Sequence, residues 1–434
     1  MKIILNKLIN SPFVKNVAIM ATGTAGAQVI TMALSPIITR LYGPEAFGMM
    51  GTFTALTRII IPVAALTYPI AMVLPKSDKN AKGLMKLSLY ITLAIAFITT
   101  LILLFFNNNI VNVFQIEEIA PFLYLIPLVI IFAGVMQVAQ QWLIRTNQFS
   151  INAKATFLQS VVTNGSKAAI GFIYPAATVL VVLQAAGNGI RAFMMVMFAR
   201  NSGYKSETQS YEESYSIRNL AKKYRDFPMY RSPQVFLGEF SENLPILLLT
   251  TFFGPASAGF YNIGRTVLGL PSRFIGQSIG DVFYPRISEA ANNGENMSRL
   301  IAKATISLGA IGIIPFGIVI IFGPWLFEFV FGSGWDVAGE YARWISLTSF
   351  AVFMNKPSVR SMPVLNAQRF HLIYTIVLVA TRCLALIIGF YIFNSDIIAI
   401  ALFGISSLLL NIFLFIITLS LSKKLEKSNA LEAK

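Results

Sequence analysis

Residues 372–393 read LIYTIVLVATRCLALIIGFYIF, an uncharged run apart from Arg382 near its middle. A helix of about 20 such residues is long enough to cross the hydrocarbon core of a bilayer. A cation at the centre of that core costs roughly 2.5–3.5 kcal/mol on insertion scales, so Arg382 is not expected to face lipid. The stretch therefore predicts a transmembrane helix whose one cation faces water, protein or a bound anion.

Similar runs recur along the chain of 434 residues, and its composition agrees with a membrane protein. Hydrophobic residues make up 56% and charged residues 12%, whereas soluble domains carry about 25% charged residues. Twelve transmembrane helices are predicted, at residues 17–38, 47–74, 84–106, 119–143, 155–174, 177–198, 233–253, 257–283, 300–323, 341–365, 372–393 and 397–421.

The formal net charge is +15, and the loops between the predicted helices alternate between Lys/Arg-rich and acidic. Cytoplasmic loops of inner-membrane proteins carry an excess of Lys and Arg. The alternation predicts a multi-pass membrane protein with both termini in the cytoplasm. Nucleic-acid binding also favours a basic balance, but the cations here do not gather on one polar domain. No nucleic-acid partner is expected.

The longest polar segment, 201–232, is predicted to be a cytoplasmic linker with a short amphipathic helix near Ser216–Tyr224. It would separate an N-terminal lobe of six helices, 1–200, from a C-terminal lobe of six helices, 233–434. The predicted fold class is thus an all-α integral membrane protein with two pseudo-symmetric lobes around a central cavity.

Short matching motifs suggest that the two halves are copies. The segment GPEAFG at 43–48 follows the first span, and GPASAG at 254–259 follows the seventh. Leu-Pro-Lys at 74–76 and Tyr-Pro-Arg at 284–286 follow the second and eighth spans. Because six is even, such copies share one orientation, as in parallel repeats related by an axis along the membrane normal. The Gly-Pro segments are predicted to be helix corners without a ligand.

Cations inside the predicted spans are the candidate substrate-binding residues. Lys356 and Arg360 are four positions apart, so they share one helix face. Long side chains near a span end can reach the interface instead, and this alternative stays open for Arg191, Arg265 and Arg360. Four cations lie too deep for that, namely Arg58, Lys167, Arg273 and Arg382. A cationic cavity that binds an anion is therefore predicted. The set comprises Arg58, Lys167, Arg191, Arg265, Arg273, Lys356, Arg360 and Arg382.

Three carboxylates are candidates for ion coupling. Glu239 and Glu242 are three positions apart on the seventh span, and Asp281 lies at the cytoplasmic end of the eighth. Carboxylates inside membranes often relay protons, but these could equally pair with buried arginines, and Asp281 could be exposed. A proton or sodium gradient is thus a possible energy source.

The sequence carries no sign of a cofactor or of a catalytic centre. Cys383 and His371 are the single cysteine and histidine, which leaves a metal site or a Ser-His-Asp triad poorly supported. No Walker A motif is present, so ATP is not expected to drive transport. No metal, cofactor or enzymatic activity is expected.

Several segments resemble bacterial lipid-linked oligosaccharide flippases, which translocate O-antigen and related polysaccharide units. The similarity extends along nearly the whole chain and is carried by SPIITRLYGPEAFG (35–48), MVLPKSD (72–78), KYRDFP (223–228), FGPASAGFY (253–261) and LGLP (268–271).

The resemblance implies membership of the multidrug/oligosaccharidyl-lipid/polysaccharide exporter superfamily, with a V-shaped pair of six-helix lobes and alternating access. It implies an oligosaccharide on undecaprenyl pyrophosphate as cargo, for surface polysaccharide biosynthesis at the bacterial cytoplasmic membrane. A polysaccharide polymerase is a candidate further partner, which the sequence leaves open. Related peptidoglycan-precursor flippases typically have fourteen spans, so the twelve spans here argue against that subgroup. A multidrug exporter of the same superfamily and a membrane enzyme of polysaccharide assembly are the alternatives.

Overall fold

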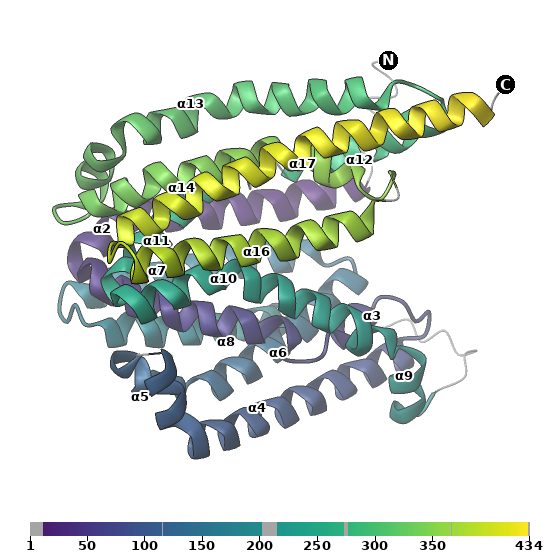
Figure 1. The fold of residues 1–434 in the computed structure, drawn as a ribbon. Helices are drawn as coiled ribbons and strands as arrows, with labels where there is room; N and C mark the ends of the chain where they lie inside the picture. The colour runs from purple at the N-terminus through teal and green to yellow at the C-terminus, as the bar shows by residue number, and fades with distance from the viewer. Residues whose placement is uncertain (1–11, 115, 202–214, 273–276, 366, 433–434) are drawn as a thin grey trace. The chain divides into compact units, whose positions relative to one another are not determined.

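The computed structural model describes residues 12–114, 116–201, 215–272, 277–365 and 367–432. Throughout these residues the regular structure is helical, without a strand (Figure 1). The chain forms two compact units, Met1–Thr251 and Phe252–Lys434. The predicted all-α fold class is confirmed.

The first unit holds the helices up to most of α10. Long helices alternate with short helical turns, and the order is α2 (Pro12–Ile60), η1 (Ile61–Val63), α3 (Tyr68–Ala71), α4 (Asp78–Phe114), η2 (Glu117–Ile119), α5 (Ala120–Leu123), α6 (Ile126–Arg145), α7 (Phe149–Gly171), α8 (Ala177–Asn201), α9 (Ile217–Lys223), η3 (Phe227–Arg231) and α10 (Ser232–Phe253).

The second unit continues with helices alone in its described residues. Their order is α11 (Pro255–Pro271), α12 (Gln277–Asn292), α13 (Met297–Phe331), α14 (Asp336–Met354), α15 (Lys356–Ser361), α16 (Gln368–Tyr391) and α17 (Asp396–Glu432).

Twelve helical segments correspond to the twelve predicted spans when the two parts of α2 are counted separately. Seven of the described helices are long and apolar enough to cross a membrane: α2, α4, α6, α8, α13, α16 and α17. The other four spans fall on α7, α10, α11 and α14, which are shorter or carry more polar side chains, such as Lys167 on α7 and Glu239 on α10. Polar residues inside membrane bundles typically face the protein interior or a water-filled cavity.

Both predicted Gly-Pro corners are present. Gly43 interrupts α2 with φ 71° and ψ 174°, and Gly254 precedes α11 with φ 86° and ψ 174°. This backbone region is essentially restricted to glycine. The proline that follows each glycine suits the first position of the next helix. The shared conformation at corresponding corners supports the predicted repeat.

The predicted boundaries are wrong at three spans, which are broken where single helices were expected. Helix α2 ends at Ile60, where Pro62 lacks the N–H that a continuing helix needs, and Thr67 then has φ 57°. The tenth span divides at Asn355, because Pro357 would clash with the preceding helical turn. The fourth divides between α5 and α6, at Tyr124 and Leu125.

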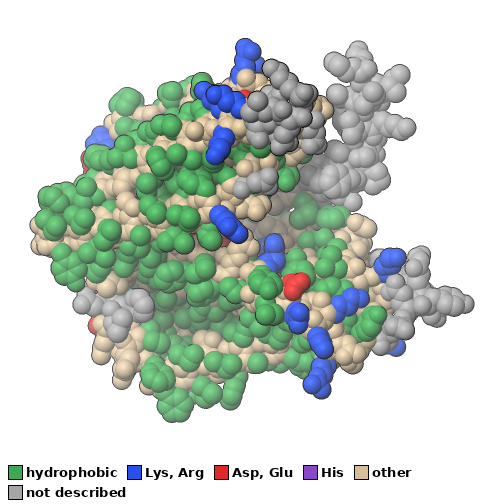
Figure 2. Space-filling view, turned by 45° about the vertical axis from the view of Figure 1, so that its right-hand side comes forward, with side chains coloured by type: hydrophobic (Ala, Val, Ile, Leu, Met, Phe, Trp, Pro, Cys, Tyr) green, Lys and Arg blue, Asp and Glu red, His purple; other side chains and the backbone are tan. Residues whose placement is uncertain are grey.

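Helix α4 carries large apolar side chains that are exposed on the surface of the protein. Phe97 is 64% exposed and Phe105 is 76% exposed, in a helix with no charge between Lys86 and Phe114. Figure 2 shows hydrophobic side chains over much of the visible surface. A surface of this kind is suited to contact with acyl chains, as in a multi-pass membrane protein.

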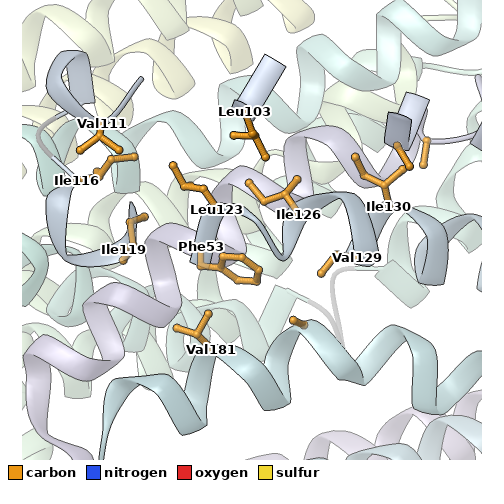
Figure 3. Packing of buried hydrophobic residues seen from close by; sticks show 13 residues of the cluster. Phe53, Leu103, Val111, Ile116, Ile119, Leu123, Ile126, Val129, Ile130 and Val181 are labelled. Atoms are coloured by element: carbon orange, nitrogen blue, oxygen red, sulfur yellow. The ribbon is translucent and has the colours of Figure 1, made fainter. Parts of the chain in front are cut away.

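A buried apolar cluster of the first unit includes Phe53, which is 1% exposed (Figure 3). Its neighbours come from several helices and include Leu103 of α4, Leu123 of α5, Ile130 of α6 and Val181 of α8. Because lipid tails are as apolar as these side chains, helix association in a membrane depends on close van der Waals packing. Phe53 therefore stabilises the unit by filling space between helices.

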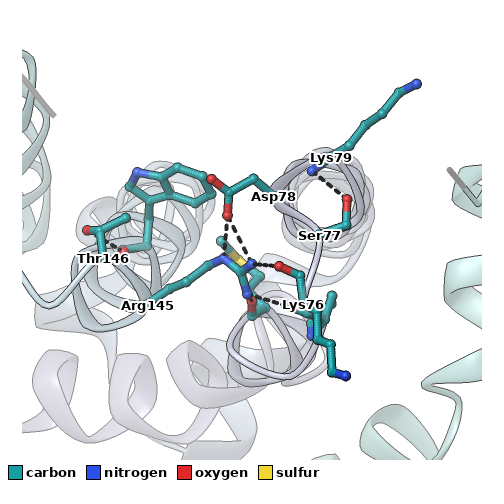
Figure 4. Close-up of polar contacts among 9 residues, drawn as sticks. Lys76, Ser77, Asp78, Lys79, Arg145 and Thr146 are labelled. Carbon is teal, nitrogen blue, oxygen red and sulfur yellow. Dashed lines mark hydrogen bonds and ion pairs between the residues drawn. The ribbon is translucent and has the colours of Figure 1, made fainter. Parts of the chain in front are cut away.

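Arg145 holds the loop between α3 and α4 against the end of α6 (Figure 4). Its Nε donates to Asp78 Oδ1 at 3.0 Å, and its other nitrogens donate to the carbonyl oxygens of Met72, Pro75 and Lys76. A guanidinium satisfies several acceptors at once in this way. This basic loop residue is thus a structural clamp.

The predicted short helix of the linker is confirmed as α9, whose N-cap Ser216 accepts a hydrogen bond from the Asn219 N–H. Leu220 of α9 is 0% exposed and packs in a cluster with Leu84 of α4. The segment after α9 is held against the start of α3, because Thr67 Oγ1 donates to the Phe227 carbonyl oxygen. The first unit ends at Thr251, so most of α10 belongs to the first unit. The assignment of α10 to a C-terminal lobe stays a prediction.

Candidate functional site

A pocket of about 270 Å³ lies within the first unit, between α2, α6, α7 and α8. One part of its wall is apolar and includes Phe53, Ile61 and Val129. The other part is polar, with Thr54, Thr57, Arg58, Gln159, Thr163, Gln184 and Asn188. Among the described residues no carboxylate lines this pocket, so Arg58 supplies the formal charge of its described wall.

Arg58 lies in the last turn of α2 and is an exposed residue of the pocket wall. An arginine side chain stays charged in proteins and presents several N–H donors in one plane. Of the candidate cations within the described residues, Arg58 is the one on the wall of this pocket.

Lys167 of α7 is 5% exposed and lies behind the pocket wall. Its Nζ is 2.9 Å from Gln184 Oε1 and 3.5 Å from the sulfur of Met50. The Tyr42 hydroxyl donates to its backbone carbonyl oxygen at 2.8 Å. Lys167 thus joins both parts of α2 to α7 and α8, and contacts the pocket through Gln184.

The two glutamines of the pocket have defined amide orientations. A lysine ammonium group only donates, so Gln184 turns its oxygen to Lys167 and keeps its NH₂ group for another acceptor. Gln159 Nε2 donates to Thr163 Oγ1 at 3.0 Å, which leaves the Gln159 oxygen as an acceptor. The wall therefore offers both donors and acceptors.

Arg191 of α8 also joins helices of the first unit. Its Nη2 donates to Oδ1 of Asn152, a buried residue of α7, at 3.0 Å. Its Nε is buried and has no partner among the described residues. Arg191 is thus held inside the bundle rather than extended to the interface.

The predicted cations of the second unit do not share one described pocket. Arg382 Nε donates to Ser407 Oγ at 2.8 Å, and its guanidinium carbon is 5.0 Å from the Phe403 ring centroid, so it packs between α16 and α17. Arg265 on α11 and Lys356 on α15 are half-buried, and Arg360 is exposed. Arg273 lies outside the described residues.

Two of the candidate coupling carboxylates, Glu239 and Glu242, are not part of the pocket wall. Glu239 is half-buried on α10, and its Oε2 accepts from Asn243 Nδ2 at 3.2 Å. Glu242 is exposed. The side chain of Asp281 lies outside the described residues.

Sequence reasoning missed the uncharged part of the pocket. Gln159 and Thr163 are four positions apart on α7, and Gln184 and Asn188 are four apart on α8. Residues at this spacing share one face of a helix. Paired amide and hydroxyl side chains on otherwise apolar helices were the signal that could have found them.

The fold matches solved transporter structures at low sequence identity. An inward-facing multidrug resistance transporter of the MATE family, in the MOP superfamily, has a TM-score of 0.71 at 12% identity, covering 92% of this chain and 96% of its own. The lipid II flippase MurJ, in an inward closed conformation, has a TM-score of 0.70 at 12% identity, with coverages of 95% and 90%. A MOP superfamily transporter from Pyrococcus furiosus has a TM-score of 0.52 at 10% identity, with coverages of 95% and 94%.

A comparison with curated proteins gave no match. The family described as "Polysaccharide biosynthesis protein" matches residues 37–340, which is more than half of the chain and includes the pocket. This chain therefore belongs to the polysaccharide biosynthesis protein family, and it has the fold of the MOP superfamily flippases and exporters.

Proposed function

We propose that this protein is a flippase for lipid-linked oligosaccharides. It moves repeat units on undecaprenyl pyrophosphate from the cytoplasmic to the outer leaflet of the bacterial cytoplasmic membrane by alternating access. The product serves the assembly of a surface polysaccharide such as O-antigen. Membership of a polysaccharide biosynthesis family supports the cargo class, and the likeness to transporters supports the mode of action.

The observation that carries the proposal is the pocket with Arg58 on its wall, in a bundle of apolar helices. A pyrophosphate cannot cross hydrocarbon unaided, because a charge there is costly. Guanidinium groups bind phosphate oxygens through paired, charge-assisted hydrogen bonds. Arg58 would bind the pyrophosphate, while Lys167 and Arg191 hold the helices that surround the pocket.

Arg58 also argues against the multidrug alternative where the drug is a cation, because like charges repel. An ion gradient would reset the transporter, with Glu239 or Glu242 as the carboxylate that takes up the proton or sodium ion. A polysaccharide polymerase would then receive the cargo at the outer face.

The test replaces Arg58 with Ala in a host whose surface polysaccharide depends on this protein. Polymer at the surface should fall by at least about tenfold, as expected when a charged contact of ~1.5 kcal/mol or more is lost. Arg200→Ala is the matched control, because Arg200 is exposed in the last turn of α8 and is not part of the pocket wall.

Membrane levels of each variant are measured alongside the polymer. A normal polymer level with Arg58→Ala, at equal protein, would contradict the proposed role of the pocket. Resistance to cationic drugs on expression, with no effect on polymer, would favour the multidrug exporter instead.

A further inference from the structure

We infer that the pocket of the first unit binds one sugar of the cargo, the sugar next to the pyrophosphate. This inference rests on the proposed function and names the part of the cargo that enters the pocket. Arg58 binds the pyrophosphate at the wall, and the uncharged polar residues beside it bind the sugar ring.

The size of the pocket suits a single sugar. Its volume is about 270 Å³, just below the roughly 300–1,000 Å³ of pockets for drug-sized ligands. An oligosaccharide of several sugars would exceed this space. The rest of the repeat unit must then lie outside the pocket.

The polar wall matches the chemistry of a sugar rather than that of a second phosphate. Phosphate oxygens only accept hydrogen bonds unless protonated, whereas sugar hydroxyls both donate and accept. Gln184 is left with N–H donors by its contact with Lys167, and Gln159 is left with an oxygen acceptor by its contact with Thr163. The Gln159 acceptor would gain a partner from a hydroxyl but not from a phosphate.

The apolar wall gives the C–H face of a sugar ring a surface to pack against. Ile61 is half-buried and offers this surface, while Phe53 and Val129, 1% and 2% exposed, support it from the core cluster behind. A pocket with an apolar wall and a few placed polar groups is the usual form of a small-molecule site.

Gly187 keeps the space between these groups open. A Cβ at this position would lie 3.3 Å from Gln159 Nε2 and 3.9 Å from Thr163 Oγ1. Alanine is favoured over glycine inside a helix by about 1 kcal/mol, so the substitution should not harm α8 itself. Gly187→Ala therefore narrows the pocket beside Gln159 without a change of charge.

The experiment measures binding to the purified full-length protein in lipid nanodiscs. The probes are a short-chain prenyl pyrophosphate alone and the same compound carrying one glucose or one N-acetylglucosamine. Wild-type protein should bind at least one sugar-bearing probe about tenfold more tightly than the bare pyrophosphate, the gain from roughly one well-formed polar contact.

Gly187→Ala and Gln184→Ala should lose this gain and keep the affinity for the bare pyrophosphate. Arg58→Ala should bind all probes more weakly. Gly238→Ala is the matched control, because a Cβ there meets no atom within 4 Å and Gly238 lies on α10 outside the pocket wall. Thermal melting of each variant shows that it is folded.

The two proposals fail in different ways. A gain from the sugar that persists in folded Gly187→Ala and Gln184→Ala, or no gain in the wild type, overturns the sugar pocket alone. No binding of any probe by the wild type, or unchanged binding by Arg58→Ala, overturns the proposed function and the sugar pocket with it.

Discussion

The Tyr341 hydroxyl donates to Asp396 Oδ2 at 2.5 Å, and Ser257 Oγ donates to the same oxygen at 3.0 Å. Tyr341 is 0% exposed, so this polar group has no ready access to water. The three residues come from α14, α17 and α11, which lie far apart in the sequence. The contact therefore joins three helices of the second unit at one carboxylate.

Tyr341→Phe should destabilise the second unit, because Asp396 loses its shorter hydrogen bond. Hydrogen bonds to charged groups contribute about 1.5–3 kcal/mol, so a lower melting temperature in detergent is expected. Tyr391→Phe is the control: Tyr391 is 74% exposed on α16, and the same atom is removed there. Equal melting temperatures for both variants would contradict a stabilising role for this bond.

For single residues, the sequence predicts that a charged side chain is kept away from lipid, but it does not predict which residue that side chain contacts. That Lys167 is kept away from lipid follows from the cost of a charge in a bilayer, and the side chain is 5% exposed. Its partner Gln184 could not be predicted, because the contact depends on how α7 packs against α8. Arg58 and Arg382 looked alike in the sequence, yet one lines a pocket and the other packs on Phe403.

Helix α9 has seven residues and would be only marginally stable alone. Leu220 supplies its buried contact with α4. Leu220→Ala should therefore release the linker and increase cleavage by added protease between α8 and α10. Loss of a buried Leu typically costs about 2–5 kcal/mol.

Leu93→Ala is the control for this effect. Leu93 is 53% exposed on α4, so the same atoms are removed without a loss of packing. If both variants were cleaved at the wild-type rate, the attachment of α9 would not depend on Leu220.

Element positions were largely predictable, while the breaks were not. Hydropathy located the spans because a helix in lipid must be long and apolar. Pro62 and Pro357 were visible signals for breaks, but bundles tolerate proline when neighbours satisfy the backbone. Whether a helix bends or ends at a proline depends on tertiary contacts, which hydropathy does not contain.

The orientation of the chain across the membrane can be tested. The excess of Lys and Arg in alternate loops predicts a cytoplasmic linker between α8 and α10 and an outer loop between α13 and α14. Alkaline phosphatase should be active when fused within 332–335 and inactive when fused within 202–214. Green fluorescent protein should give the reverse pattern. The opposite result at either site would refute the proposed topology.

Lys167 connects four helical segments: the two parts of α2, its own helix α7, and α8. Its carbonyl oxygen is tied to Tyr42, its ammonium group touches Met50, and the same group orients Gln184. A twist of α7 about its own axis would pull on all of these contacts together. Cargo release and helix rotation would then be mechanically linked, since Gln184 could not keep its orientation while α7 turned.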